Sequence, residues 1–363
     1  MVGLGVIGFA AGLAGRPNED YLWLARLVAS AGFPDPGSMN FSVIILNWNG
    51  REHLESCFTA LAAQTLREFE TIMVDNASQD DSINYVRERF PWVRLVALTE
   101  NRGFSGGNAA GLAVALGENV VLLNNDTRPE SDWMKMLSQC ASVHPEIGMI
   151  ASHLTDWNGE NTDSAGDGCR VTGRGFARHR RLPVATAPDS GPVFGACAGA
   201  ALYRRKLIED VGFLDEDFFL NFEDTDLAFR AQLRGWTAWF CREAVVRHRV
   251  SATQGAWSKI NVYYGARNHL WVCAKNLPGR FMLICSPLIV AEILALFVGS
   301  VMHRRGSAYS QGFVAGLRGL PRMWRKRGEI QQGRRRTPGA LLRQLQYPRL
   351  TVRGLRRMFG LSE

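Results

Sequence analysis

The chain has 363 residues, of which 46% are hydrophobic and 21% are charged, enough apolar sequence for one large domain or a domain with an appendage. This composition excludes a disordered polymer. Seven cysteines without a CxxC pair or regular spacing argue against a disulfide scaffold or zinc module and fit a reducing cytosol. The net charge of +8 belongs to the tail: residues 303–363 carry 15 Lys and Arg against two acids, or +13, so the first 302 residues carry −5.

The N-terminal run MVGLGVIGFAAGLAG is apolar, but it lacks the basic residues and the clear cleavage site of a signal peptide. Gly3, Gly5 and Gly8 have the G-x-G-x-x-G spacing, yet only two residues precede them, so no strand can lead into a dinucleotide site. Met39 stands directly before the first convincing strand. We expect residues 1–38 to be an N-terminal extension, either poorly ordered or upstream of the start that is used.

Strand and helix patterns alternate from Phe41 onward. A short, β-branched apolar run of this kind is typical of a buried parallel strand, and apolar residues at helical spacing follow it. The expected strands are 41–47, 69–74, 93–98 and 120–123, and the expected helices surround 54–61, 82–90 and 106–116. This alternation predicts a mostly parallel sheet covered by helices on both faces.

Polar loops follow each of these strands: NWNG, DNASQDD, TENRGFSGGN and NNDT. Singly, each suits an ordinary turn or helix cap. Together they lie at the carboxyl ends of parallel strands, where ligands of such sheets bind. The segment with Gly103, Gly106 and Gly107 leads into a helix and could receive a phosphate beside Arg102, although it matches neither the P-loop nor the dinucleotide pattern. Asp126 is suited to a divalent cation, because Mg²⁺ and Mn²⁺ prefer oxygen ligands.

The stretch FFLNFEDTDLAFR places Glu223, Asp224 and Asp226 against apolar residues. Acids in the first turn of a helix interact favourably with its dipole, so a capping role alone would explain them. An acid beside apolar surface can also be a functional group with a perturbed pKa. The segment by itself leaves both interpretations open.

These motifs, in this order, resemble a family 2 glycosyltransferase of the GT-A fold, and most closely its bacterial rhamnosyltransferase-like branch. The resemblance covers about Phe41 to Asn276 and includes VIILNWNG, VDNASQDDS, ENRGFSGGNAAG, VVLLNNDT, FFLNFEDTDLAFR and VRHR. It implies a nucleoside-diphosphate sugar as donor. The residues expected to bind this donor are Asn47, Asn49, Asp75, Asn101, Arg102, Gly103, Asn108 and Asn125.

The resemblance also assigns roles to the acids. Asp75 matches the aspartate that reads the nucleotide base, and Asp126 matches the last acid of a metal-binding D-x-D whose first acid is here Asn124. His248 resembles a late histidine near the metal or diphosphate, although a lone histidine is also often structural. Asp224 matches the catalytic base, with Glu223 and Asp226 as supporting acids.

The implied reaction is a direct displacement with inversion. The base takes a proton from the acceptor hydroxyl, which attacks the anomeric carbon as the nucleoside diphosphate leaves. The branch implies dTDP-rhamnose or a UDP-hexose as donor and a cell-surface glycan or lipid-linked saccharide as acceptor. Residues 155–187, rich in Gly, Asp and Arg, are expected to form a loop or small subdomain over the acceptor side, with a strand near it at 194–202.

Residues 281–302 are apolar and long enough to span a bilayer. A span would place the basic tail on the far side of the membrane from a cytosolic domain, against the positive-inside tendency. We therefore expect residues 277–363 to form a re-entrant or interfacial hydrophobic segment followed by a basic helical tail, which hold a 39–276 GT-A domain on the anionic cytoplasmic face of the membrane. A helix pair buried against the domain is the alternative.

Two other functions are compatible with parts of the sequence. A metal-dependent nucleotidyltransferase would need a second strand-borne acid near Asp126, where Asn124 stands instead. A nucleic-acid binder would use the arginine-rich tail but would leave the acids at the strand ends unexplained, and the tail's apolar residues suit lipid or protein contacts better than base stacking. We expect no nucleic-acid partner.

Overall fold

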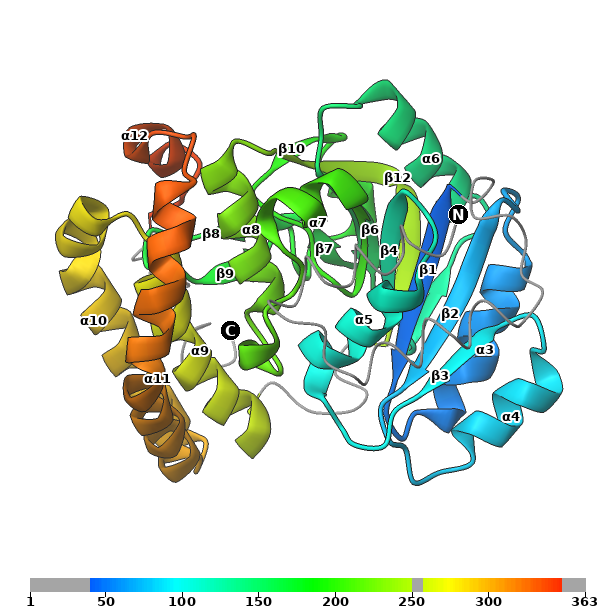
Figure 1. Cartoon of the computed structure of the whole chain (residues 1–363), viewed down its shortest axis with the longest axis horizontal. Coiled ribbons are helices and arrows are strands. Elements are labelled where there is room, and N and C mark those ends of the chain that lie inside the picture. The colour runs from blue at the N-terminus through cyan, green and yellow to red at the C-terminus, as the bar shows by residue number, and fades with distance from the viewer. Residues whose placement is uncertain (1–39, 250–256, 348–363) are drawn as a thin grey trace, which may run out of the picture.

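The computed structural model describes residues 40–249 and 257–347, which form a twisted sheet flanked by helices (Figure 1). The sheet has ten strands, eight of them in the order β10-β12-β6-β11-β4-β1-β2-β3, while β5 pairs with β12 and β7 pairs with β6. The strands are β1 Phe41–Asn47, β2 Phe69–Asp75, β3 Arg94–Ala97, β4 Asn119–Asn124, β5 Thr127–Pro129, β6 Met149–Thr155, β7 Thr162–Ala165, β10 Gly191–Val193, β11 Ala200–Arg204 and β12 Ala238–His248. The antiparallel hairpin of β8 Asp167–Cys169 and β9 Gly175–Ala177 lies apart from this sheet.

The predicted parallel core of the sheet is confirmed. Strands β1, β2, β3 and β4 are parallel, as are β6 and β12, whereas β11 runs antiparallel to both of its neighbours. Side chains alternate between the faces of a strand, and successive residues of β1 accordingly enter different cores. Val43 and Ile45 pack on one face of the sheet and Ile44 on the other.

Helices cover both faces of the sheet. The core that contains Val43 is closed by α3 Arg51–Ala62, α4 Ser82–Arg89 and α6 Trp133–Val143. The core that contains Ile44 is closed by α5 Gly103–Val114, α7 Arg205–Val211 and α8 Glu223–Arg234, and it continues into the C-terminal helices. The short 3₁₀ helices η2 Val184–Thr186 and η3 Glu216–Phe218 lie in the connections.

Two expected elements differ from the structure. The helix expected at 106–116 begins three residues earlier, because Gly103 adopts a left-handed φ of 69° as the first residue of α5. The strand expected at 194–202 begins only at Ala200, since the preceding residues turn to reach the β8 strand and the N-terminus of α8. Residues 155–187, expected to form a loop or small subdomain, contain β7, which joins the main sheet, and the separate β8–β9 hairpin.

The C-terminal region is a bundle of α9 Lys259–Asn276, α10 Gly279–Met302, α11 Gly306–Gln332 and α12 Pro338–Leu342 on one side of the sheet domain (Figure 1). Close packing joins α9 and α11: a Cβ added at Gly312 would lie 2.1 Å from the Tyr263 carbonyl oxygen. The Glu292 carboxylate of α10 accepts a hydrogen bond of 2.8 Å from Arg170, next to β8. The bundle is therefore fixed to the part of the fold that carries β8.

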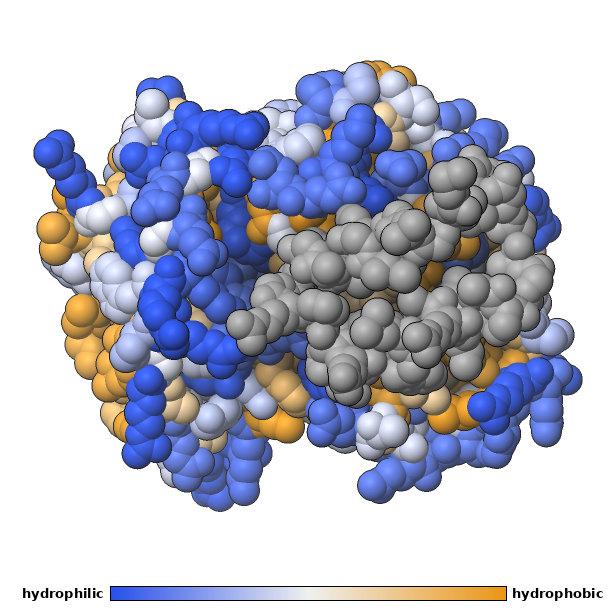
Figure 2. Space-filling view, in the orientation of Figure 1, coloured by the Kyte–Doolittle hydropathy of each residue, from blue (hydrophilic) through white to orange (hydrophobic). Residues whose placement is uncertain are grey.

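One helix among the described residues, α10, is long and apolar enough to cross a membrane, with a mean hydropathy of 2.5 in its most apolar window. Only 22% of that window is buried. Figure 2 shows hydrophobic surface at the edge of the molecule where Figure 1 places α10. One face of α10 packs on the domain, as in the alternative of a helix pair against the domain, and its other face is exposed.

Candidate active site

The polar loops predicted to converge do so at the carboxyl edge of the parallel strands. Asn47 at the end of β1 pairs in register with Asp75 at the end of β2, and Asn47 Nδ2 donates to Asp75 Oδ2 over 3.1 Å. Asn125, directly after β4, donates from Nδ2 to Asn47 Oδ1 over 2.8 Å. Three predicted donor-site residues from three strand ends thus form one hydrogen-bonded chain.

Asp75 is 1% exposed, and both of its oxygens have partners within the chain. Oδ2 accepts from Asn47, and Oδ1 accepts from the Ser78 amide over 2.9 Å. Asn49, in a left-handed conformation with φ 51°, accepts from the Gln79 amide and so joins the first loop to the second. These contacts show how the loops are held, whereas the base-reading role of Asp75 stays a prediction.

The glycine-rich segment is not the open phosphate cradle that we expected. The amides of Gly103 and Arg102 donate to the side-chain oxygens of Asn101 and Asn76, respectively, over 2.8 Å each. The next two amides of α5, those of residues 104 and 105, both donate to the Phe219 carbonyl oxygen. The N–H groups that a helix N-terminus normally offers to an anion are therefore used inside the protein.

Arg102 and Asn108, both predicted to bind the donor, are also bonded within the chain. The Arg102 guanidinium lies 3.0 Å from the Glu216 carboxylate. Asn108 is 1% exposed, and its side-chain amide donates to the Phe104 carbonyl one turn earlier in α5. These contacts give Asn108 a role inside the helix and place Arg102 beside η3, the element that precedes the acids of α8.

Asp126 and His248, the two predicted metal-site residues, lie together. The carboxylate Oδ1 of Asp126 is 3.4 Å from His248 Nε2, because β5, next to Asp126, pairs with the end of β12. On the other side of the ring, Nδ1 is 2.9 Å from Asp163 Oδ2 on β7. Burial alone would lower the pKa of His248, but hydrogen bonds with Asp126 and Asp163 raise it to about 9.

This set of side chains fits a divalent cation. A carboxylate that orients a histidine through one ring nitrogen and leaves the other nitrogen toward the ion is the usual outer arrangement of a metal-binding histidine. Here Asp163 occupies the orienting position at Nδ1, while Asp126 and Nε2 face one another. Carboxylate oxygens with one imidazole nitrogen are donors that suit Mg²⁺ or Mn²⁺.

Asp224 lies in the first turn of α8 and faces residues from two other segments. One oxygen of Asp224, one oxygen of Asp167 and the thiol sulfur of Cys197 all lie within 4.8 Å of one another. Asp224 accepts a hydrogen bond from the Thr225 amide over 2.6 Å. Burial raises the pKa of Asp224, an effect that hydrogen bonds from Thr225 and the Ala198 amide partly offset.

Asp167 forms the second half of this carboxylate pair. Burial and the neighbouring Asp224 raise the pKa of Asp167 well above its ordinary value, and one Asp167 oxygen lies 3.2 Å from the Ser164 hydroxyl, which donates to it. Burial also raises the pKa of the Cys197 thiol. Asp167 and Cys197 therefore favour their neutral forms, whereas the hydrogen bonds to Asp224 favour its ionised form.

The other two predicted catalytic acids have different surroundings. Glu223 is 7% exposed, and burial together with Asp224 raises its pKa to about 8. Asp226 is fully buried, and its carboxylate accepts from Arg230, Lys275 and Asn276 over 2.8 Å each. The structure thus separates Asp226 from Asp224: its oxygens belong to an ion network behind the helix.

The residues that carry most of this site are similar in sequence to a known protein family. Residues 42–212 match the family described as glycosyl transferase family 2. The chain carries a family 2 glycosyltransferase domain. The matched range contains the strand-end loops, Asp126 and Asp167, while Asp224 and His248 lie beyond its end.

Characterised relatives of this glycosyltransferase share modest identity with it. An N-acetylglucosaminyl-diphospho-decaprenol L-rhamnosyltransferase of Mycobacterium tuberculosis is 27% identical over 241 residues, covering 59% of this chain and 77% of that protein. The low-salt glycan biosynthesis hexosyltransferase Agl10 of Haloferax volcanii is 22% identical over 240 residues, covering 63% of this chain and 74% of that protein. The resemblance to rhamnosyltransferase-like members of the family is confirmed.

The predicted GT-A fold is likewise confirmed by a solved structure. The crystal structure of GalNAc-T7 with UDP, GalNAc and Mn²⁺ superposes with a TM-score of 0.56 at 15% identity, covering 72% of this chain and 52% of that chain. Such a likeness establishes the arrangement of the sheet and helices.

Sequence reasoning missed Asp163 and Asp167 in the glycosyltransferase. Both lie in the weakly periodic stretch 155–187, which we assigned only as a whole to the acceptor side. Asp163 on β7 contacts His248, and Asp167 on β8 faces Asp224, so two residues four positions apart link the two halves of the site. The number of Asp residues in this stretch was the one available signal, and it could not show which of them face the site.

Proposed function

We propose that this glycosyltransferase moves a sugar, with inversion, from a nucleoside-diphosphate sugar of the dTDP-rhamnose or UDP-hexose type to a hydroxyl of a lipid-linked saccharide or growing cell-surface glycan. The observation that carries the proposal is the short link between the two halves of the site. Asp163 and Asp167 lie on strands that follow one another in the chain, one at the His248–Asp126 pair and the other at Asp224.

Asp224 is the proposed base of this reaction. Inverting transfer needs one group that accepts the proton of the attacking hydroxyl and a second feature that stabilises the leaving diphosphate. The raised pKa of Asp224 makes its carboxylate a better proton acceptor at neutral pH, provided that it is ionised. The neutral state of Asp167 leaves the negative charge of the pair on Asp224.

Asp126 and His248 would hold a Mg²⁺ or Mn²⁺ ion, with Asp163 orienting the imidazole. When bound, such a cation neutralises the charge that develops on the departing diphosphate. A polar cavity of about 400 Å³ adjoins this position, lined by Asp156, Asn161, Thr162, Asp163, Arg180 and Arg181. Its size and its mixture of carboxylate, amide, hydroxyl and guanidinium groups suit part of a sugar substrate.

The substrate class is supported by relatives. The mycobacterial protein is named an N-acetylglucosaminyl-diphospho-decaprenol L-rhamnosyltransferase, and this chain matches 77% of that protein's length. An acceptor carried on a polyprenyl diphosphate lies at a membrane surface. An apolar helix face on the catalytic domain suits an enzyme that meets its acceptor there.

We infer that α10 lies in the membrane interface on the cytoplasmic side and does not cross the bilayer. Its Glu292 faces inward to Arg170 and Arg174, whereas Leu283, Ile284 and other apolar residues are exposed. A helix bound laterally to the sheet domain along one side can insert its outer side into the headgroup region but cannot span. The basic residues of the C-terminal region would add attraction to anionic lipids.

The test is a panel of nucleotide sugars offered with a polyprenyl-diphosphate N-acetylglucosamine acceptor or a soluble saccharide. We expect sugar transfer from one donor class, dependence on Mg²⁺ or Mn²⁺, faster transfer to the lipid-linked acceptor, and a product of inverted anomeric configuration by NMR. A product of retained configuration would overturn the mechanism, and failure to consume any nucleotide sugar would overturn the function.

A further inference from the structure

The loop that leads into α8 has an unfavourable backbone. Phe219, Asn221 and Phe222 have φ values of 62°, 67° and 70°, although none of them is glycine. Non-glycine residues adopt this left-handed region at a cost, and such strain persists only where surrounding contacts impose it. Phe222 is the N-cap of α8, and Asp224 is the second residue of that helix. The conformation of the loop therefore determines where the proposed base points.

Side chains of helix α9 hold this loop by donating hydrogen bonds to the backbone carbonyl groups of the loop. The side-chain amide of Asn268, which is fully buried, lies 3.0 Å from the carbonyl oxygen of Phe218, 2.8 Å from that of Leu220 and 2.7 Å from that of Asn221. Beside it, Arg267 donates to the Phe218 carbonyl over 2.6 Å. These donors belong to the C-terminal bundle and lie about 50 residues after the loop.

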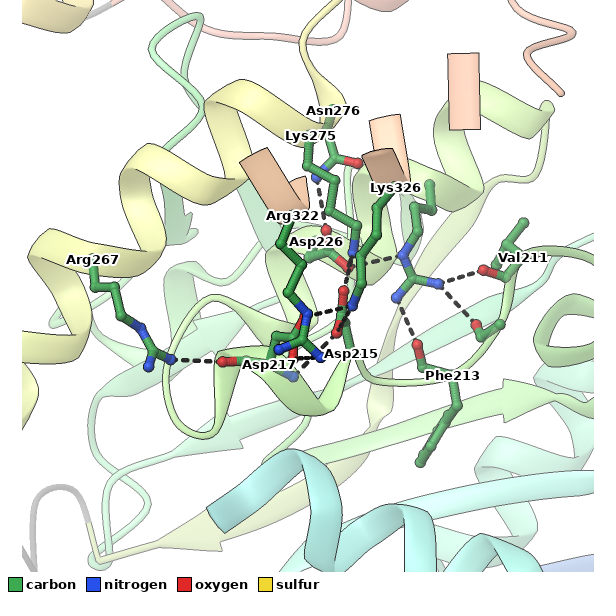
Figure 3. Close-up of polar contacts among 12 residues, drawn as sticks. Val211, Phe213, Asp215, Asp217, Asp226, Arg267, Lys275, Asn276, Arg322 and Lys326 are labelled. Carbon is green, nitrogen blue, oxygen red and sulfur yellow. Dashed lines mark hydrogen bonds and ion pairs between the residues drawn. The ribbon is translucent and has the colours of Figure 1, made fainter. Parts of the chain in front are cut away.

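An ion network continues the contact to α11 (Figure 3). Lys275 on α9 lies 2.6 Å from Asp215 before the loop and 2.8 Å from Asp226 after it, so one ammonium group joins both ends. Lys326 on α11 lies 2.6 Å from Asp215 and 2.7 Å from Asp217. Burial alone would raise the pKa values of Asp215 and Asp226, but their cationic partners lower both below the ordinary range.

We propose that Lys326 is a positioning residue for the transfer reaction, and that the C-terminal bundle therefore belongs to the catalytic unit of the enzyme. Its ammonium neutralises Asp215, the N-cap of η3, and Asp217 within η3, and so fixes the start of the strained loop that orients Asp224. Lys326 reaches these acids from a helix more than 100 residues further along the chain. The expected effect on kcat rests on the proposed function, but the effect on the conformation of the loop can be measured separately.

The test compares three full-length variants with the wild type. Lys326→Met keeps the aliphatic stem and removes the charge, and Lys326→Arg restores the charge. Arg325→Met makes the same change of charge at an adjacent exposed residue of the same helix. We expect Lys326→Met to lower kcat of sugar transfer roughly 10- to 100-fold with the donor KM changed less than threefold. Lys326→Arg should recover most of this loss, and Arg325→Met should behave as the wild type.

Hydrogen exchange distinguishes failure of this inference from failure of the proposed function. Amides of residues 218–224 should exchange faster in Lys326→Met than in the wild type and Arg325→Met, whether or not sugar transfer is detected. Should Lys326→Met not fold, Asp217→Asn removes one partner of Lys326 and should show a smaller change of the same kind. Unchanged exchange in this segment, or kcat within twofold of wild type, would overturn the inference. A parallel loss of kcat and donor affinity would also do so, because general loosening predicts it.

Discussion

Asp167 and Asp224 form a carboxylate pair whose members come from a small hairpin and the first turn of a helix, with oxygens within 4.8 Å of each other. Two carboxylates at this distance do not both ionise easily. Burial, and after it the charge of Asp224, raises the pKa of Asp167 well above its ordinary value, so Asp167 is the member of the pair that favours the protonated form. The pair thus provides one candidate base, Asp224, and one neutral neighbour, Asp167.

This assignment predicts opposite outcomes for two similar substitutions. Asp224→Asn removes the proton acceptor and should lower the rate of transfer on the order of 10²- to 10⁴-fold while nucleotide binding remains. Asp167→Asn resembles the protonated state that Asp167 already adopts, so transfer at neutral pH should stay within a few-fold of wild type. Parallel measurement of transfer rate, nucleotide affinity and Tm checks both. Equal losses in the two variants would contradict this assignment, and a larger loss in Asp167→Asn would assign the base to Asp167.

Asp126 is expected to carry the dependence on divalent cations. Asp126→Ala should weaken binding of the nucleoside diphosphate in the presence of Mn²⁺ by roughly tenfold or more and have little effect on binding without the ion. Asp163→Asn is the matched comparison, because it removes the negative charge beside His248 Nδ1 and leaves Asp126 in place. Asp163→Asn should weaken binding of the nucleoside diphosphate less than Asp126→Ala does. Calorimetric titration with and without Mn²⁺ gives these values, and full wild-type activity after thorough chelation would contradict the role.

Much of this site follows from the sequence because it depends on strand order. Parallel strands bring their carboxyl ends to one edge, so Asn47, Asp75 and Asn125 could be placed together from periodicity alone. Asp224 and Asp226 differ for a reason that is also local: residues two apart on a helix point to nearly opposite sides. This difference in direction could have shown from the sequence that Asp224 and Asp226 do not face the same site.

The rest depends on contacts between distant segments. Lys275 contacts Asp226, and Lys326 contacts another acid of the same ion network. These lysines lie 49 and 100 positions after Asp226, on helices whose packing against the domain has no pairwise signal in the sequence. Asp167 lies in a stretch without helical or strand periodicity, where no pattern predicts which side chain faces inward. The use of the α5 amides by the Phe219 carbonyl could not be foreseen either, since it requires the left-handed loop to approach that helix.

Glu223 should make the stability of the enzyme depend on pH. Its pKa is about 8 in the folded protein, above the ordinary value of about 4.3, so the folded state retains a proton that the unfolded state releases. The free energy of unfolding therefore decreases as pH rises from about 4 to 8, as far as this residue contributes. Glu223→Gln cannot release a proton and should remove that part of the slope. Denaturant titrations at pH 6 and 9 measure it, and an unchanged slope in the variant would contradict the raised pKa.

The outer face of α10 should determine binding to lipid. Leu283 and Ile284 are 72% and 74% exposed, and transfer of such side chains into an apolar layer contributes about 1.5 kcal/mol or more each. Leu283→Asn and Ile284→Asn should therefore each lower partitioning to anionic vesicles roughly tenfold. Binding of the wild type should also fall with added salt, because salt screens the attraction of exposed basic residues to the lipid.

The control for this prediction is Val143→Asn, a change of the same kind at a residue 71% exposed at the end of α6, on the other side of the sheet domain (Figure 1). It should leave vesicle binding unchanged. Substitutions are preferable to deletion of residues 303–363, because the deletion also removes Lys326 and would mix loss of lipid binding with movement of Asp224. Co-sedimentation with vesicles at low and high salt gives the bound fraction for each variant. If the wild type stays wholly in solution with anionic vesicles at low salt, or if Val143→Asn reduces binding as much as Leu283→Asn, α10 is not the lipid-binding surface.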